Sequence, residues 1–226
     1  MHRLGGFKEE PHILAITEAY KNNGYTVVTF DTANTIGESE GDYEYATITN
    51  YLEDLEDVIA WSKEQDWYSE PLHLCGHSLG AICATEYAIH NPDEVAALIP
   101  ISSVISGELS VQSPFYAEEA PKWKAQGWRE WKSDAKPGIV KRLPWSHMED
   151  RMNYNLLDGA ELLTMPVLVM VGSEDPITPP DHQKMLFEAL DTDKEYYEIE
   201  GAGHTFPAQE HLDDLQQTID EWLQKY

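Results

Sequence analysis

Gly76-His77-Ser78-Leu79-Gly80 follows the apolar run 72–75 and precedes 81–90, a stretch compatible with a helix. A Gly-x-Ser-x-Gly motif at such a strand-to-helix turn is typical of a nucleophilic serine, whose Oγ stands clear at the top of a strained turn. The two glycines lack a Cβ and therefore let the strand and the helix cross closely. The same residues also fit a plain turn in which Ser78 is an ordinary helix N-cap. The motif predicts a hydrolase, and the rest of the chain must decide between these interpretations.

Apolar runs typical of strands recur along the chain with helical stretches between them. The runs are 26–30, 72–75, 97–101, 167–171 and 196–199. The apolar positions that share one helix face are Ile48, Leu52, Leu55 and Ile59 in one stretch and Leu212, Leu215, Ile219 and Trp222 in another. Right-handed crossovers place such helices on both faces of a parallel sheet. We therefore predict an α/β fold whose chemistry lies at the carboxyl ends of the strands.

A serine at neutral pH is a weak nucleophile and needs an imidazole base that a carboxylate orients. The run 167–171 leads to Asp175, and the run 196–199 leads to His204 on a glycine-containing loop. Serine, acid and histidine in this order match the triads built on sheets of this kind. Taken singly, Asp175 before Pro176 also fits a turn start, and His204 also fits a surface loop. Glu174 competes with Asp175 for the role of the acid, and the residues alone leave both open.

A tetrahedral intermediate needs hydrogen-bond donors aimed at its developing oxyanion. The N–H of Leu79, directly after Ser78, is one candidate. The second is the N–H of Leu4 in His2-Arg3-Leu4-Gly5-Gly6, the glycine-rich loop near the chain start. A flexible terminus explains this loop equally well.

The segment 107–162, called the cap below, interrupts the alternation of strands and helices. It is rich in tryptophan and proline, and we expect it to lack strands. A connection of this length is usually a lid or a binding loop, and its tryptophans argue against disorder. We predict a core of 1–106 and 163–226, with Trp128, Trp145 and His147 of the cap touching substrate. A small helical subdomain whose aromatic side chains pack only on one another fits the cap as well.

The 226 residues include 41 acidic and 15 basic side chains, which give a formal charge of -26. Such a charge repels nucleic acid and anionic membrane surfaces and favours a small, uncharged substrate. Because the acidic residues are spread along helical faces, they are typical of a solvated surface. Adaptation to high salt is a hypothesis that follows from the same excess.

Cys75 and Cys83 are predicted to be buried thiols rather than a disulfide, which indicates a reducing compartment. No apolar run has the length of a membrane span, and residues 1–10 lack the apolar core of a signal peptide. The histidines show no metal-ligand spacing. We therefore expect a cytoplasmic protein that uses no metal and no other cofactor, and its oligomeric state stays open.

Along nearly its whole length the chain resembles the α/β-hydrolase superfamily, in particular small bacterial serine esterases related to monoacylglycerol lipases and cinnamoyl (feruloyl) esterases. The matching motifs are the oxyanion loop at 2–6, Asp31 with the Gly-x-Ser-x-Gly loop at 37–41, the elbow at 76–80, a cap inserted after the family's sixth strand, 172–175 with Thr178-Pro179, and 201–204. The resemblance implies that Ser78 is the nucleophile, Asp175 the orienting acid and His204 the base.

The chain departs from this family in two places. The family's oxyanion loop has glycine where this chain has Arg3, whose side chain is expected to crowd the donors. The family's first three strands precede that loop, whereas here only Met1 does. Since the third strand lies between the fourth and fifth in the family's sheet, either the run 26–30 moves to fill the gap or the sequence is a truncated form.

Our main hypothesis is a cofactor-independent carboxylesterase that cleaves short-chain acyl or aryl esters through an acyl-enzyme. Feruloyl esterase, thioesterase and amidase activities stay open, because the same groups serve each reaction. The hypothesis from a different class is an inactive or catalytically weak binding protein with a hydrolase-like fold, since the oxyanion loop is altered and its supporting strand is missing.

Overall fold

The computed structural model describes residues 1–133 and 136–226. Within them lies a parallel sheet of four strands in the order β1-β2-β5-β6. The strands are β1 (Leu72–His77), β2 (Val95–Ile101), β5 (Val167–Gly172) and β6 (Lys194–Ile199). Four of the five predicted strands are therefore confirmed. Every residue of β5 is buried, as expected for a parallel strand that helices cover on both faces.

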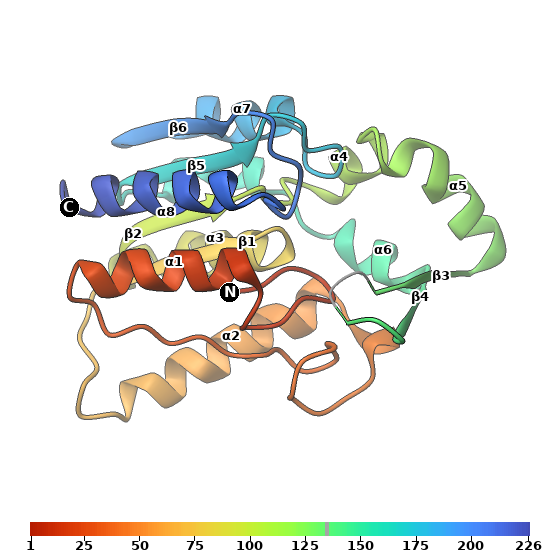
Figure 1. Ribbon diagram of the computed structural model, residues 1–226, viewed down its shortest axis with the longest axis horizontal. Helices are drawn as coiled ribbons and strands as arrows, with labels where there is room; N and C mark the ends of the chain where they lie inside the picture. Colours follow the sequence, from red (N-terminus) through yellow and green to blue (C-terminus); the bar gives the residue numbers. More distant parts are fainter. Residues whose placement is uncertain (134–135) are drawn as a thin grey trace.

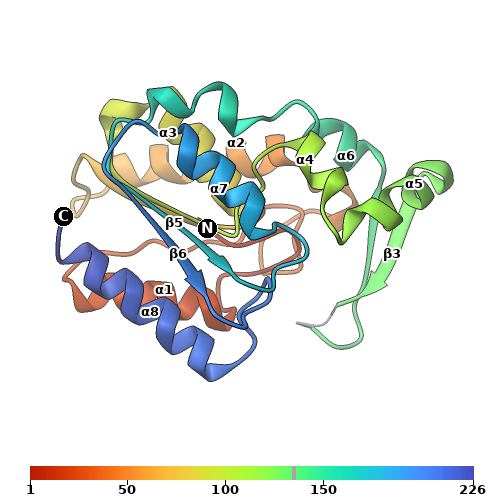
Figure 2. The ribbon, with the colours of Figure 1, turned by 90° about the horizontal axis from the view of Figure 1, so that it is seen from above.

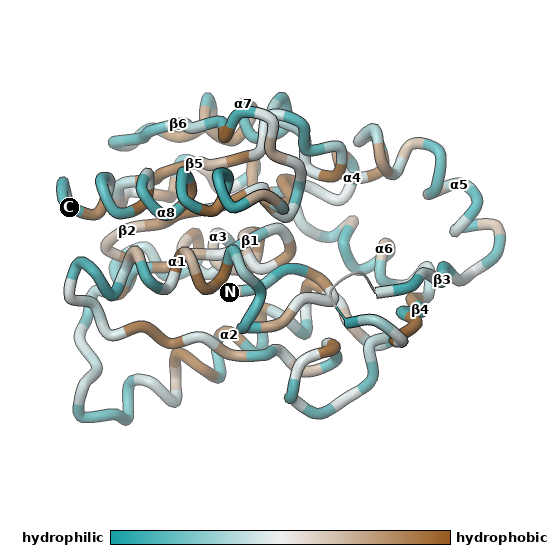
Figure 3. Tube along the Cα trace, viewed as in Figure 1, coloured by the Kyte–Doolittle hydropathy of each residue, from teal (hydrophilic) through white to brown (hydrophobic). Residues whose placement is uncertain are grey.

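Two layers of helices enclose the sheet (Figures 1 and 2). One layer contains α2 (Ile48–Lys63), α3 (Leu79–His90) and α7 (Pro180–Ala189), and the other contains α1 (Pro11–Asn22) and α8 (Gln209–Leu223). Strand side chains alternate between the layers: Leu98 packs with α2 and α3, and its neighbours Ala97 and Ile99 pack with α1 and α8. Figure 3 shows hydrophobic residues concentrated along β2 and β5. The predicted α/β architecture is confirmed.

Short elements complete the chain. They are the helices α4 (Gly107–Gln112), α5 (Tyr116–Gln126) and α6 (Ser146–Arg151) and the 3-10 turns η1 (Tyr43–Tyr45), η2 (Pro92–Glu94), η3 (Leu156–Asp158) and η4 (Ala160–Leu162). None of the helices in 1–133 or 136–226 is both long and apolar enough to cross a bilayer.

The cap contains an antiparallel hairpin of β3 (Trp128–Lys132) and β4 (Val140–Pro144). The expectation that this segment lacks strands was therefore wrong. Each half of the hairpin is only five residues long, and it forms a strand because the other half supplies its hydrogen-bond partners. Figure 1 shows the hairpin with α4, α5 and α6 beyond the carboxyl ends of the sheet strands.

The prediction of a strand at 26–30 was also wrong, because this segment is irregular in the structure. A groove of about 420 Å³, lined by both segments, separates it from β1. Its β-branched residues suit an extended chain, but a strand also needs a neighbouring backbone to accept its hydrogen bonds. Among the described residues, Met1 provides the backbone hydrogen bonds on this edge of β1: its ammonium donates to the Cys75 oxygen, and its oxygen accepts from the His77 N–H.

Candidate active site

Ser78 links the end of β1 to the start of α3 with φ 58° and ψ −113°. This positive φ is rare for a residue other than glycine and is typical of a strained functional turn. The turn needs both flanking glycines. A Cβ on Gly76 would lie 2.3 Å from the Gly80 oxygen, and a Cβ on Gly80 would lie 2.6 Å from the His2 oxygen. The elbow therefore requires glycine at these two positions, as the motif predicted.

His204 joins Ser78 to Asp175 through hydrogen bonds. Its Nε2 lies 2.9 Å from the Ser78 Oγ, and its Nδ1 lies 2.7 Å from the Asp175 Oδ2. The loops after β1, β5 and β6 supply these three residues, because parallel strands end at one edge of the sheet. The structure thus brings together side chains that are far apart in the sequence.

Asp175 lies in a buried site that stabilises its charged form. One carboxylate oxygen accepts from the N–H groups of Ile177 and Thr178, and the other accepts from the Thr178 hydroxyl and faces His204. Burial alone would raise the pKa of Asp175, but the charge of His204 and these hydrogen bonds lower the pKa to about 2. Glu174, the competing acid, is exposed to solvent. The geometry therefore favours Asp175 over Glu174 as the partner of His204.

Hydrogen bonds hold the loop at residues 2–6 to Thr32 and Tyr51. His2 Nδ1 bonds to the Arg3 oxygen, its Nε2 accepts from the Thr32 N–H, and burial lowers the pKa of His2 to about 4. The Gly5 N–H donates to the Tyr51 hydroxyl. Leu4, which packs on the core, lies in the turn that this network fixes. These contacts favour an ordered loop over a flexible chain start.

The other oxyanion candidate, Leu79, is the first residue of α3. The first N–H groups of a helix have no helical carbonyl to bond, so they are available to a ligand or an anion. The side chain of Arg3 passes beside Gly6, where an added Cβ would lie 2.9 Å from the Arg3 Cγ, and forms an ion pair with Glu10, which is buried. The departure from glycine at position 3 is therefore accommodated through Glu10.

His77 has a packing and hydrogen-bonding role. Its side chain is completely buried, its Nε2 lies 2.8 Å from the His204 backbone oxygen, and its ring packs on His12. Burial, followed by the neighbouring histidines, lowers the pKa of His77 well below its ordinary value. His77 therefore supports the backbone that carries His204.

The three cap residues predicted to touch substrate lie in different surroundings. Trp128 is on the hairpin face that also carries Arg142, whose guanidinium lies 3.8 Å from its ring. Trp145 packs edge-to-face on Trp123. His147 is buried with both ring nitrogens occupied, one 2.7 Å from the Ala46 oxygen and the other 2.9 Å from Arg151. Burial and the charge of Arg151 lower the pKa of His147 to about 3. A substrate role for these three residues stays a prediction.

The sequence analysis did not single out Tyr43, Arg129 or Trp131. The Tyr43 ring approaches Gly5 of the loop, and it packs edge-to-face on Trp131 with ring centroids 5.8 Å apart. Arg129 lies 4.5 Å from the Trp131 ring. Apolar and polar residues do not alternate in 128–132 or 140–144, so no local pattern indicated this arrangement. Arg129 and Trp131 share a face because the segment pairs as a strand.

The candidate site combines a serine hydroxyl, an imidazole and a carboxylate in hydrogen-bonding contact. No group of three or more histidine, cysteine, aspartate or glutamate side chains within 1–133 and 136–226 is arranged to hold a metal ion. The use of no cofactor stays a prediction. Both cysteines are free thiols, as predicted, but only Cys83 is buried, whereas Cys75 is half-buried.

Comparisons with known proteins agree with this fold. The model of the alpha/beta hydrolase family matches residues 7–217. The mitochondrial palmitoyl-protein thioesterase ABHD10 of Bos taurus is 24% identical over 94% of this chain and 68% of its own length. The corresponding protein of Mus musculus is 27% identical over 74% of this chain and 54% of its own length. This chain thus spans only part of these relatives.

Solved structures show the same architecture. Est1E of Butyrivibrio proteoclasticus with ferulic acid bound superposes with a TM-score of 0.82 at 21% identity, over 100% of this chain and 86% of that one. The monoacylglycerol lipase of Paleococcus ferrophilus superposes with a TM-score of 0.74 at 25% identity, over 99% and 91% of the two chains. Together with the family model, these likenesses lead to one conclusion. This chain belongs to the alpha/beta hydrolase family.

Proposed function

We propose that this protein is a serine hydrolase that cleaves carboxylic esters through an acyl-enzyme. The proposal rests on one observation above all, the hydrogen-bonded series from the Ser78 Oγ through His204 to Asp175 at a strained elbow. In this proposal His204 Nε2 takes the proton of Ser78 as its Oγ attacks the ester carbonyl. Asp175 holds the ring through Nδ1 and stabilises the imidazolium that forms.

The first half of the reaction ends when His204 gives its proton to the leaving alcohol and the acyl group stays on Ser78. The second half uses the same groups. A water molecule that gives a proton to His204 then attacks this acyl-enzyme. As the second tetrahedral intermediate collapses, His204 returns this proton to the Ser78 Oγ and the acid is released. The N–H groups of Leu4 and Leu79 are proposed to hold the oxyanion in both steps, because the loop at 2–6 packs directly on the elbow.

The proposed substrates are short-chain acyl or aryl esters. Aromatic side chains in the cap, among them Trp131 and Trp145, favour an apolar or aromatic part of the ester, and we propose that 107–162 forms the lid of the site. A feruloyl esterase activity is one form of this proposal. A thioesterase activity is the second candidate, since the mammalian relatives that match much of this chain are named palmitoyl-protein thioesterases. A cytoplasmic location stays a prediction that rests on the free thiols.

Ser78→Ala tests the proposal directly. If the triad acts as a unit, this change lowers the rate of p-nitrophenyl acetate hydrolysis by about a millionfold, because the nucleophile is lost. Circular dichroism of the variant checks that the fold is retained. Unchanged hydrolysis would refute the assignment. Assaying a matched ester and thioester with the same acyl group separates the two candidate activities.

Labelling with a fluorophosphonate separates an enzyme from an inactive binding protein. Stoichiometric modification of Ser78, located by mass spectrometry, is expected for an activated serine. A folded sample that takes up no label would support the binding protein instead. His204→Gln is the companion variant, since loss of the base should abolish labelling while Ser78 is still present.

A further inference from the structure

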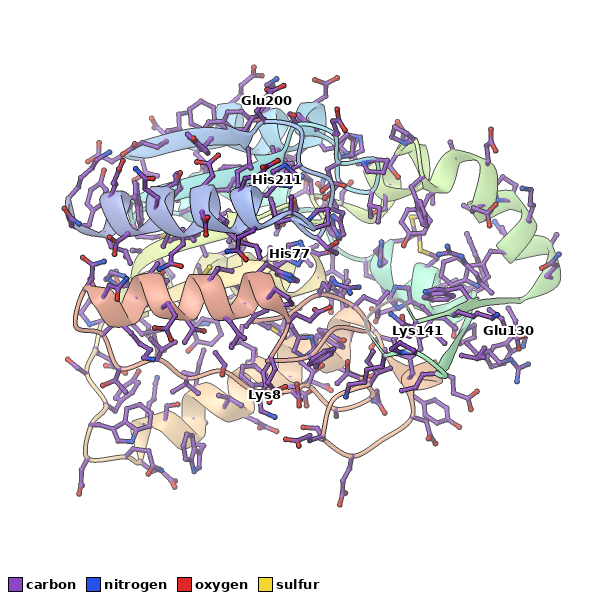
Figure 4. The ribbon with its side chains drawn as sticks, viewed as in Figure 1. Lys8, His77, Glu130, Lys141, Glu200 and His211 are labelled. Carbon is purple, nitrogen blue, oxygen red and sulfur yellow. The ribbon has the colours of Figure 1, made fainter. Side chains whose placement is uncertain are left out.

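The hairpin of the cap has two different faces. Alternation along the paired strands places Arg129, Trp131, Lys141 and Leu143 on one face, and Lys141 and Leu143 are buried. Glu130 and Arg142 lie on the other face, where they form an exposed ion pair. Figure 4 shows Lys141 lying near the N-terminal loops and Glu130 farther out on the cap. We call the face with Arg129 the inner face.

Arg129 is surrounded by aromatic rings on this inner face. Its guanidinium carbon lies 4.5 Å from the ring centroid of Trp131, 4.9 Å from Phe115 and 5.9 Å from both Tyr116 and Trp123. Among residues 1–133 and 136–226 it makes no ion pair and no hydrogen bond. Attraction to the rings stabilises the charge of the guanidinium, but its N–H donors have no hydrogen-bond acceptor among the described residues.

Within the part of the chain that the structure describes, Arg129 has no acidic partner, which is unexpected because the sequence has 41 acidic residues and 15 basic ones. The charges are distributed unevenly, because the cap contains eight of the basic residues and only nine of the acidic ones. The cap is therefore nearly neutral, and almost all of the charge of -26 lies in the rest of the chain. The overall charge of the chain favours an uncharged substrate. Because the cap itself is nearly neutral, however, it does not repel an anion.

The aromatic rings around Arg129 connect it to both sides of the candidate active site. On one side, the N–H of Phe115 donates to the oxygen of Pro176, directly after Asp175. On the other side, Trp131 packs on Tyr43, whose ring would lie 2.7 Å from a Cβ on Gly5 of the loop at 2–6. Arg129 therefore lies between the loop of the triad acid and the proposed oxyanion loop.

Two further polar groups face this region. The Tyr43 hydroxyl is buried without a hydrogen-bond partner in the described chain, and Arg129 is close enough to influence its ionisation. Lys141 Nζ donates to the Gly5 oxygen and lies over the rings of Tyr43 and Trp131. A buried hydroxyl without a partner costs free energy, and a ligand oxygen would satisfy it.

We propose that Arg129, with the Tyr43 hydroxyl, binds a carboxylate carried by the ester substrate at a distance from the scissile bond. A guanidinium pairs with a carboxylate through two parallel N–H···O bonds, and the surrounding rings strengthen this pair by excluding water. The inference rests on the proposed esterase function and names its substrate class, esters with an anionic end.

The test compares esters that differ in this carboxylate. In the first pair the acyl part carries the carboxylate in mono-p-nitrophenyl glutarate and lacks it in p-nitrophenyl valerate. In the second pair the alcohol part carries the carboxylate in 4-acetoxybenzoate and lacks it in the methyl ester of that compound. In at least one pair, Arg129→Met is expected to lower kcat/KM for the anionic ester about 10- to 100-fold more than for the neutral ester. Arg129→Lys keeps the charge without the paired donors and should fall between.

Arg142→Met is the matched control, because Arg142 lies over a tryptophan on the opposite face of the same hairpin. This variant should leave the ratio of anionic to neutral activity within about twofold of the wild type. The proposal is overturned if Arg129→Met changes neither ratio, if it lowers both members of each pair equally, or if Arg142→Met shifts the ratio as much. Ser78→Ala must abolish all four hydrolyses; if it does not, the esterase mechanism itself fails.

Discussion

At the scale of single residues, His204 depends on Asp175, which in turn depends on its own hydrogen bonds. Two backbone N–H groups and the Thr178 hydroxyl hold the carboxylate in place before any substrate arrives. The ring is therefore oriented by a group whose position is fixed by packing. Such preorganisation is what allows a proton transfer to proceed without rearrangement.

Asp175→Asn should lower the rate of ester hydrolysis by about ten thousandfold, because the amide favours the wrong tautomer of His204. It should also change the pH dependence of stability. The folded pKa of Asp175 is about 2 and its ordinary value is 3.8. Asp175 therefore stays deprotonated in the folded chain at pH values where it takes up a proton in the unfolded chain. The carboxylate contributes about 2 kcal/mol above pH 4, and this contribution disappears as the pH falls towards 2.

Urea unfolding between pH 2 and 6 measures this difference between the variant and the wild type. Glu174→Gln removes the exposed neighbouring acid and is the control. Its unfolding profile should keep the wild-type slope between pH 4 and 2. If the free energy of unfolding changed equally with pH for the wild type and Asp175→Asn between pH 4 and 2, the carboxylate would not be stabilised as described.

At the scale of elements, the β1–α3 elbow combines a strained serine with a close crossing of two backbones. Gly76→Ala places a Cβ 2.3 Å from the Gly80 oxygen and 2.7 Å from the Ala81 nitrogen, both of which are backbone atoms that cannot turn aside. We expect a loss of about 3 kcal/mol in the free energy of unfolding. Urea denaturation followed by fluorescence gives this value.

Gly203→Ala is the matched substitution in the loop of His204. A Cβ there meets no heavy atom of the described residues within 4 Å, so stability should change by less than about 0.5 kcal/mol. Equal stability of the two variants would contradict the close crossing at the elbow.

At the scale of the whole molecule, almost all of the charge of -26 lies in residues 1–106 and 163–226. Repulsion among these negative side chains opposes folding. The Debye length falls from about 10 Å at 0.1 M salt to about 3 Å at 1 M, so molar salt screens most of this repulsion. We expect the melting temperature to rise by roughly 5 °C or more between 0.05 and 1 M NaCl. Sucrose at matched osmolality controls for preferential exclusion. A melting temperature that does not change with salt would count against adaptation to high salt.

Sequence patterns alone predicted the elbow at Ser78, the helix faces of α2 and α8, and the order of serine, acid and histidine. These features depend on the local period of hydrophobic residues and on turns that need glycine, and both are properties of neighbouring residues in the chain. The choice of Asp175 over Glu174 needed the resemblance, and the structure then placed Asp175 against His204.

Other features were decided by partners distant in the sequence. The run 26–30 has the composition of a strand but lies across a groove from β1, whereas β3 and β4 become strands because each supplies the other's hydrogen bonds. Likewise, nothing in the sequence indicated that Arg151 and the Ala46 oxygen occupy the ring nitrogens of His147. Local sequence determined where the chain can be extended or helical and where the triad residues stand along it. Only the tertiary structure decided which backbone or side chain completes each hydrogen bond, because those partners come from elsewhere in the chain.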